Sequence, residues 1–181
     1  AWYMASVFHQ HNGLPHKALE YLDLARNHAE AVHDHQWMLQ MRAIRGFSYH
    51  ALKRHQEAVV ELQAVLPHLD PNGLLYARVL YVWCAALSFL NPTTEQFVTI
   101  ETNLRAAMHI FEQQRSYPDI LSVHMAMVQI YLDQEKRHQA QIYFRDTLEP
   151  LIESKSKVIG EVHQYYIDAL KGQLSKLGLI A

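Results

Sequence analysis

The sequence KRHQEA occupies residues 53–58 and returns as KRHQA at residues 136–140. Each copy follows an apolar stretch that contains a tyrosine, Tyr49 before the first copy and Tyr131 before the second. The two tyrosines are 82 residues apart, and the alanines that close the two copies have the same separation. Self-similarity at a fixed distance indicates a chain built from repeated structural units.

A third copy gives the period of the repeat. Ala18 lies in HKAL at residues 16–19, and it precedes Ala58 by 40 residues. The period is therefore near 40, and 82 residues span two periods. We expect a less obvious repeat between them, with its anchor near Thr99 or Ile100. This register divides the chain into repeats of about 1–34, 35–72, 73–117 and 118–155.

Each repeat contains two segments in which apolar residues recur every three or four positions, as on one face of a helix. Breakers separate these segments, such as NGLP at residues 12–15 and DPNG at residues 70–73. In NPTT at residues 91–94, Thr93 or Thr94 can cap the helix that follows. The expected helices cover residues 2–11, 15–33, 37–52, 55–69, 74–90, 94–114, 119–133, 136–154 and, at the end, 157–177.

The final helix has the composition of a terminal cap. We expect its polar side, with Lys171, Gln173 and Lys176, to face solvent, because the last unit of a stacked array needs a polar outer face. Two short helices cannot bury their apolar faces alone, so the pairs must stack on one another. The expected apolar side is broad and holds Val158, Val162, Tyr165, Tyr166, Ile167, Leu170 and Leu174.

Several small and aromatic residues recur together at matching positions of the repeats. The first repeat opens with Ala1-Trp2-Tyr3 and continues with Gly13, Ala18, Leu22 and Ala25; the second has Gly46, Tyr49, Ala58, Leu62 and Val65; the fourth has Tyr131, Ala140 and Phe144, with Thr147 where a small residue belongs; the third is degenerate, with Ala86, Phe89, Ile100, Leu104 and Ala107.

With these positions the chain resembles the tetratricopeptide repeat (TPR) family over about residues 1–154. The resemblance implies an all-α fold: a right-handed α-α superhelix, or TPR-like solenoid, of four helix pairs plus a C-terminal capping helix, in one domain of residues 1–181. The period exceeds the usual repeat of about 34 residues. Longer repeats with a break such as HDH at residues 33–35 are similar to those of bacterial signalling and transcription-regulator proteins, which bind signalling peptides or regulatory proteins.

The resemblance also implies where a partner would bind, because the first helix of each repeat lines the concave face in this family. Such a face would be apolar and aromatic with amides between, as suits a protein or peptide segment. The same apolar residues would pack between repeats if they belong to the core. The positions are Tyr3, Val7 and Gln10, then Gln40, Ala43, Phe47 and His50, then Leu80, Trp83 and Leu87, and finally Ser122, Met125 and Gln129.

Composition narrows the functional class. Lys and Arg total 16 and Asp and Glu total 18, so no basic footprint for direct nucleic-acid or anionic-membrane binding is expected. No apolar run is long enough to span a membrane. The single cysteine, Cys84, cannot form an internal disulfide and sits in an apolar helix, so we expect a buried thiol and a reducing, cytoplasmic setting. The chain opens without Met, and we expect a piece of a longer protein.

No pattern for catalysis or for a cofactor is evident. The thirteen histidines are mostly scattered; His33 and His35 could hold a metal with Asp34, but solvated histidines are the simpler interpretation, and no metal site is predicted. Arg42 and Arg45 either meet an acidic partner or lie on an exposed helix face. We therefore expect a binding module and no enzyme. Self-association, for example as a homodimer, or assembly into a larger complex is the alternative.

The register makes one prediction about packing. The substitution Ala18→Leu should lower the free energy of unfolding by about 1–3 kcal/mol, because a leucine would overfill a tightly packed interior. Thermal denaturation followed by circular dichroism measures this change. Unchanged thermal stability would contradict the register.

Overall fold

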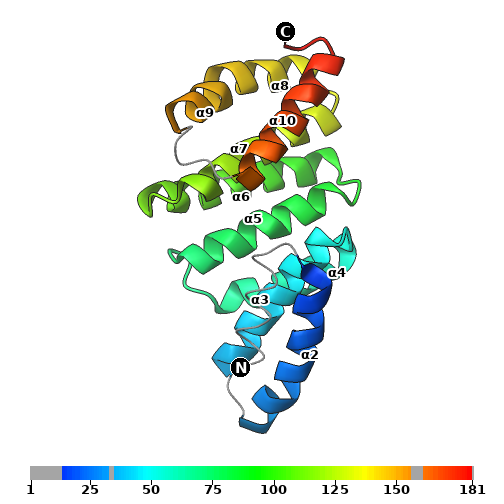
Figure 1. The fold of residues 1–181 in the computed structure, drawn as a ribbon, viewed down its shortest axis with the longest axis vertical. Coiled ribbons are helices and arrows are strands. Elements are labelled where there is room, and N and C mark those ends of the chain that lie inside the picture. The colour runs from blue at the N-terminus through cyan, green and yellow to red at the C-terminus, as the bar shows by residue number, and fades with distance from the viewer. Residues whose placement is uncertain (1–13, 33–34, 156–160, 181) are drawn as a thin grey trace. The chain divides into compact units, whose positions relative to one another are not determined.

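The computed structural model describes the chain except for residues 1–13, 33–34, 156–160 and 181 (Figure 1). The first expected helix, residues 2–11, lies outside the described residues. The described part contains helices and no strand, which confirms the all-α prediction. The elements are α2 (Pro15–Val32), α3 (His35–Ala51), α4 (His55–Val65), the 3₁₀ turn η1 (Leu66–His68), α5 (Leu74–Ser88), α6 (Thr94–Gln113), α7 (Tyr117–Asp133), α8 (Arg137–Tyr143), the π-helical turn η2 (Phe144–Leu148), α9 (Glu149–Lys155) and α10 (Glu161–Lys176).

Helix ends coincide with the local signals in the sequence. At the start of α6, the Gln96 N–H donates to Thr93 Oγ1 across 3.3 Å, and the Thr93 N–H donates to Gln96 Oε1 across 2.7 Å. This reciprocal pair is a capping box, so Thr93 is the cap of α6. None of the described helices is long and apolar enough to cross a membrane.

The sequence repeat is matched by a repeated turn. After α3, Lys53 has a left-handed φ of 60°, and the Arg54 N–H donates to the Tyr49 carbonyl across 2.8 Å. After α7, Glu135 has a φ of 58°, and the N–H of the next residue donates to the Tyr131 carbonyl across 2.9 Å. A left-handed residue with this hydrogen bond closes a helix and reverses the chain. The residues that suggested the repeat from sequence therefore form the same local structure twice.

In three of the four predicted repeats, the second helix has an alanine at the same position. Ala18, Ala58 and Ala140 are each the fourth residue of their helix, and each is fully buried. The absence of a larger side chain allows a neighbouring helix to approach closely. In the third repeat, we expected the corresponding position near Thr99 or Ile100. Of these two residues, Ile100 is buried and Thr99 is exposed.

The chain divides into two compact units, residues 1–103 and 104–181, with the boundary inside α6. In unit 1, α3 packs against α2, α4 and α5. The centre of this packing is Leu39, Ala43, Leu62, Val65 and Val79. The predicted single domain and the right-handed superhelix stay predictions.

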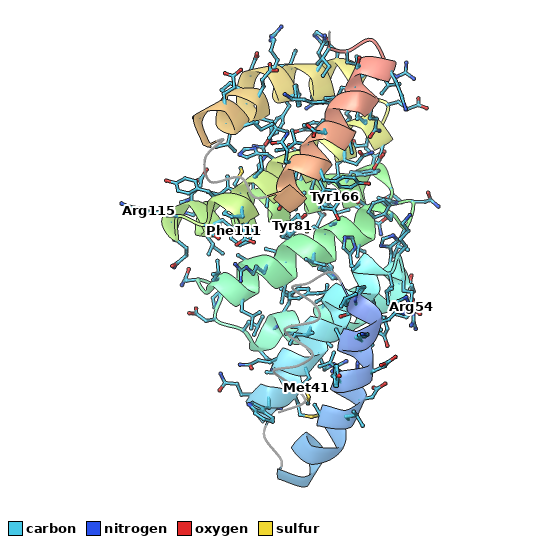
Figure 2. All side chains as sticks on the ribbon, viewed as in Figure 1. Met41, Arg54, Tyr81, Phe111, Arg115 and Tyr166 are labelled. Atoms are coloured by element: carbon cyan, nitrogen blue, oxygen red, sulfur yellow. The ribbon has the colours of Figure 1, made fainter. Side chains whose placement is uncertain are left out.

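In unit 2, α10 packs against α7, and Ile167, Leu170 and Leu174 of α10 are buried. The expectation that Tyr165 and Tyr166 share this apolar side is wrong. Their side chains are 71% and 56% exposed, and Figure 2 marks Tyr166 on α10. Contact with α7 needs only the narrow stripe of residues at three- and four-residue spacing, so the broad side that we predicted was too wide.

The π turn η2 lies between α8 and α9. Its defining bond runs from the Glu149 N–H to the Phe144 carbonyl, five residues back. Pro150 follows directly, and proline in a regular α-helix would clash with the carbonyl four residues earlier. The wider turn is consistent with this need for space.

This turn also corrects the alignment of the fourth repeat. In the second repeat, Val65 follows Ala58 by seven residues and is buried. Seven residues after Ala140 stands Thr147, which is half-buried, and the fully buried residue is Leu148. The assignment of Thr147 to the small inward position is therefore wrong, because the extra residue of the π turn moves that position along by one.

The packing of α3 on α4 leaves no room beside Gly46. A Cβ built on Gly46 would lie 2.5 Å from Cγ and Cδ2 of Leu62, whose side chain is fully buried and cannot move aside. Gly46→Ala should therefore lower the free energy of unfolding by about 1–3 kcal/mol, although alanine is the better helix former. Urea unfolding measures the change.

The matched control is Gly172→Ala in α10, where an added Cβ meets nothing within 4 Å. This variant should raise the free energy of unfolding by about 0.5–1 kcal/mol through helix propensity alone. Equal effects of the two substitutions would contradict the close approach of α3 and α4.

Candidate functional site

The residues that the sequence predicts for a binding face differ in their exposure to solvent. Tyr3, Val7 and Gln10 lie outside the described residues. Ala43 and Leu80 are 1% and 4% exposed, so they present almost no surface. The half-buried positions are Gln40, Phe47, His50, Trp83 and Leu87 in unit 1, and Ser122, Met125 and Gln129 in unit 2.

Several of these half-buried residues have a role in packing. Phe47 packs against the core of α3, α4 and α5, and Trp83 contacts both this core and the cluster of Ala58, Val59 and Ala86. In unit 2, Gln129 Nε2 donates to Asp133 Oδ1 across 2.8 Å. These side chains therefore serve the fold, and only their remaining surface can contact a partner.

A hollow of about 230 Å³ lies where α5 meets the start of α6, within unit 1. We call it the α5–α6 hollow. Most of its lining is apolar, whereas two exposed polar residues, Gln96 and Thr99, lie among the lining side chains. The hollow is lined by Trp83 and Leu87, which belong to the predicted binding face, and by Leu90, Pro92 and Ile100.

The connection of residues 91–94 positions the α6 wall of this hollow. Asn91 has a left-handed φ of 51°, and the capping box of Thr93 and Gln96 fixes the first turn of α6. The sequence predicted a helix cap at Thr93 or Thr94, but it did not identify Pro92, Gln96 and Thr99 as lining residues of a hollow. The signal was the pairing of Thr93 with Gln96 three positions later, which predicts an ordered helix start.

Three rings cluster around the turn between α3 and α4. His55 stacks on Phe89, with ring centroids 4.4 Å apart and an interplanar angle of 12°. His50 lies 5.2 Å from His55 and 6.2 Å from Phe89. The Nδ1 atoms of both histidines are buried and have no hydrogen-bond partner, and Phe89 is 54% exposed. The cluster thus joins two uncharged imidazoles to an exposed aromatic ring.

Burial sets the charge state of this cluster. It lowers the pKa of His50 to about 4, with a further contribution from His55. Burial also lowers the pKa of His55, and the charge of Lys53 acts in the same direction. At neutral pH both rings are therefore neutral, and their contacts with Phe89 are those of aromatic packing.

The two arginines of α3 are engaged within the protein. Arg42 Nε lies 2.8 Å from Glu61 Oε2, while Arg45 lies 3.4 Å from Asp23 and 3.7 Å from Glu61. Glu61 and Arg45 are mostly buried, with side chains 17% and 16% exposed. These pairs connect α3 to α2 and α4, and the Arg42 side chain keeps 41% of its surface exposed, in line with the expected exposed helix face.

Cys84 is fully buried, as expected, and burial raises the pKa of its thiol, so it is not a poised nucleophile. Two of the three residues in the HDH stretch, His33 and Asp34, lie outside the described residues. His35 makes an edge-on ring contact with His68. Over the described residues, no group of three or more His, Cys, Asp or Glu side chains is placed to hold a metal ion.

Comparisons with protein-family models, with curated proteins and with solved structures find no match to this chain. The resemblance to the TPR family therefore stays a prediction from the sequence.

The buried histidine predicts a pH dependence. In the unfolded chain His50 titrates near its ordinary value of 6.5, so acid protonates the unfolded state first and favours it. The free energy of unfolding should fall by up to roughly 3 kcal/mol as the pH drops from about 7 to about 4. His50→Phe should remove the part of this dependence that His50 contributes, while His55 and His124, whose pKa values burial also lowers, retain theirs. Urea unfolding across this range measures it.

The matched control is His16→Phe, at an exposed position of α2. This variant should keep the wild-type pH dependence. If His50→Phe and His16→Phe have the same pH profile, His50 is not the group that couples protonation to unfolding.

Proposed function

We propose that this chain is a protein- or peptide-binding scaffold, and that it acts by binding and not by catalysis. The observation that carries the proposal is the α5–α6 hollow, which is lined mainly by Trp83, Leu87, Leu90, Pro92 and Ile100. Protein interfaces concentrate their energy in a few apolar anchors that fill such pockets.

The size of the hollow suits one anchor residue. A volume of about 230 Å³ accommodates a single large apolar side chain with part of its backbone. Burying such a side chain contributes about 1.5–3 kcal/mol. Gln96 and Thr99 are polar and exposed, so they would meet the backbone of the same segment. An amphipathic helix or an extended segment with one protruding apolar residue would meet these requirements.

The wider role follows from the resemblance. Long TPR-like repeats with a polar break support a sensory or regulatory module in a signalling or transcription-regulatory protein. In such a module, binding would change the relative populations of scaffold conformations. The repeated turns at Lys53 and Glu135 support the repeat architecture on which this role depends.

Assembly of a larger complex or of a homodimer is the second candidate. Tyr165 and Tyr166 on α10 favour it, because both rings are exposed and they contact each other edge-on at 5.5 Å. Tyrosine is common at interfaces, where an apolar ring and a hydroxyl serve together.

The test is a selection of peptides from a random phage-displayed library. Thr99→Trp should block the hollow, because Thr99 is an exposed lining residue and tryptophan would fill the space. Val98→Trp is the matched control, since Val98 is the adjacent residue of α6, is 63% exposed and does not line the hollow. Wild type and Val98→Trp should enrich peptides that share an apolar anchor, and Thr99→Trp should not.

Enrichment of the same peptides on all three proteins would place binding elsewhere. No enrichment on the wild type, together with dimers in sedimentation that Tyr165→Ser and Tyr166→Ser dissociate, would favour assembly instead.

A further inference from the structure

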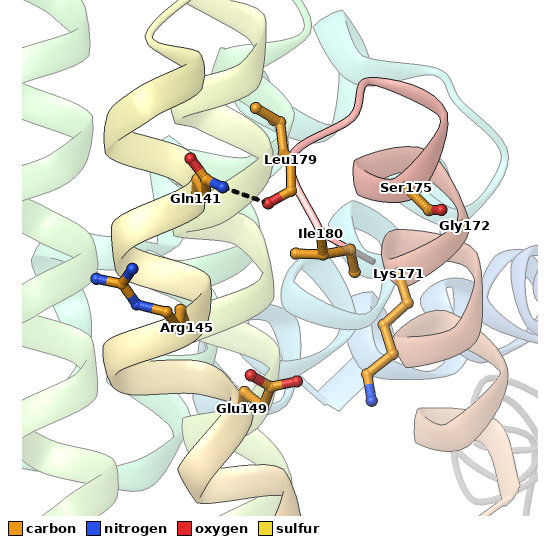
Figure 3. Close-up of a pocket in the computed structure, with 8 residues that line it drawn as sticks. All are labelled: Gln141, Arg145, Glu149, Lys171, Gly172, Ser175, Leu179 and Ile180. Carbon is orange, nitrogen blue, oxygen red and sulfur yellow. Dashed lines mark hydrogen bonds between the residues drawn. The ribbon is translucent and has the colours of Figure 1, made fainter.

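Unit 2 contains a second concave site, which is chemically different from the α5–α6 hollow. A cleft of about 540 Å³ separates the helix that contains η2 from α10 and the residues that follow it (Figure 3). This volume falls within the range of small-molecule sites, about 300–1,000 Å³. We call it the α10 cleft. Its walls carry Glu149 on one side and Lys171 and Ser175 on the other.

The charged groups of the α10 cleft are available to a ligand. Glu149 and Lys171 face the same space from opposite walls and form no ion pair or hydrogen bond with another side chain of the described part. Arg145 also lines the cleft, but its guanidinium pairs with Asp146 at 2.6 Å and turns away from α10 in Figure 3. The cleft therefore offers one carboxylate and one ammonium, separated by open space.

The position of Gly172 is a second observation that indicates a binding site in the α10 cleft. It lies inside α10, where glycine costs about 0.5–1 kcal/mol relative to alanine. A close helix contact would explain it, as at Gly46, but an added Cβ at Gly172 meets nothing within 4 Å. Gly172 lines the cleft, so the missing side chain keeps this space open.

The opposite wall contains the π turn, and such turns are frequent at functional sites. The end of the cleft is closed by Leu179 and Ile180. This segment is held by the Gln141 Nε2, which donates to the Leu179 carbonyl across 2.6 Å (Figure 3), and by the Leu179 N–H, which donates to the Leu174 carbonyl across 2.9 Å. An apolar end thus lies beside the two charges.

We propose that the α10 cleft binds a small zwitterion with an apolar side chain, either a free amino acid or a dipeptide. Its carboxylate pairs with Lys171 and its ammonium pairs with Glu149. The apolar side chain packs against Leu179 and Ile180. This site does not depend on the peptide-binding role of unit 1.

The experiment titrates the full chain with leucine and with leucyl-leucine, observed by isothermal calorimetry. At least one of the two should bind, and the tighter one distinguishes a free amino acid from a dipeptide, because their charges are differently spaced. Leucinamide, which lacks the carboxylate, and N-acetyl-leucine, which lacks the ammonium, should bind at least about tenfold more weakly.

Three variants locate the site. Gly172→Leu should abolish binding by filling the cleft, while helicity and thermal midpoint stay at or above wild type. Gln173→Leu is the matched control, because Gln173 is the next residue of α10, is exposed and does not line the cleft, and it should bind normally. Lys171→Gln, at a half-buried surface position, should weaken binding about tenfold.

The proposal is overturned if neither zwitterion binds, or if Gly172→Leu and Lys171→Gln bind like the wild type. It is also overturned if leucinamide and N-acetyl-leucine bind as tightly as leucine and leucyl-leucine, because the charges would then contribute nothing.

Discussion

Two helix pairs, α3–α4 and α7–α8, depend on one backbone constraint, a single left-handed residue that closes a helix and reverses the chain. Lys53 and Glu135 adopt this conformation, and in both places the N–H of the next residue donates to the carbonyl of a tyrosine five residues before it. The next helix then begins two residues later, so its fourth residue, an alanine, has a defined position against the neighbouring helix. In the sequence, the tyrosine marks the turn and the alanine marks the helix contact that follows it. The fixed spacing between these two residues therefore reflects the fixed geometry of the turn.

This dependence explains how much of the fold could be predicted. Helix ends follow from local chemistry. Thr93 and Gln96 cap α6 within its first turn, and residues 70–73 separate η1 from α5. The burial of Ala18, Ala58 and Ala140 follows from the repeat. The exposure of Tyr165 could not be predicted in this way, because the width of the buried stripe depends on how much of α10 the neighbouring helix covers.

The candidate site was harder to predict for a related reason. Hydrophobic periodicity identifies the apolar side of a helix but does not say whether another helix or a partner covers it. Ala43 and Leu80 proved to be core, whereas Trp83 and Leu87 reach both core and surface. The partners of Arg42 and Arg45 were equally hidden, because Glu61 and Asp23 lie on other helices, about twenty residues away in sequence. Contacts across helices require the assembled structure.

The π turn has a consequence for how repeats of unequal length share one architecture. A regular α-helix turns by about 100° per residue, so one extra residue would rotate every later side chain out of the core. The turn at Phe144–Leu148 absorbs that residue locally, and both Phe144 and Leu148 remain buried. The residues that follow the π turn therefore keep their orientation toward the core, although the helix contains one residue more. In the fourth predicted repeat, the extra residue is accommodated inside a helix and not in a loop.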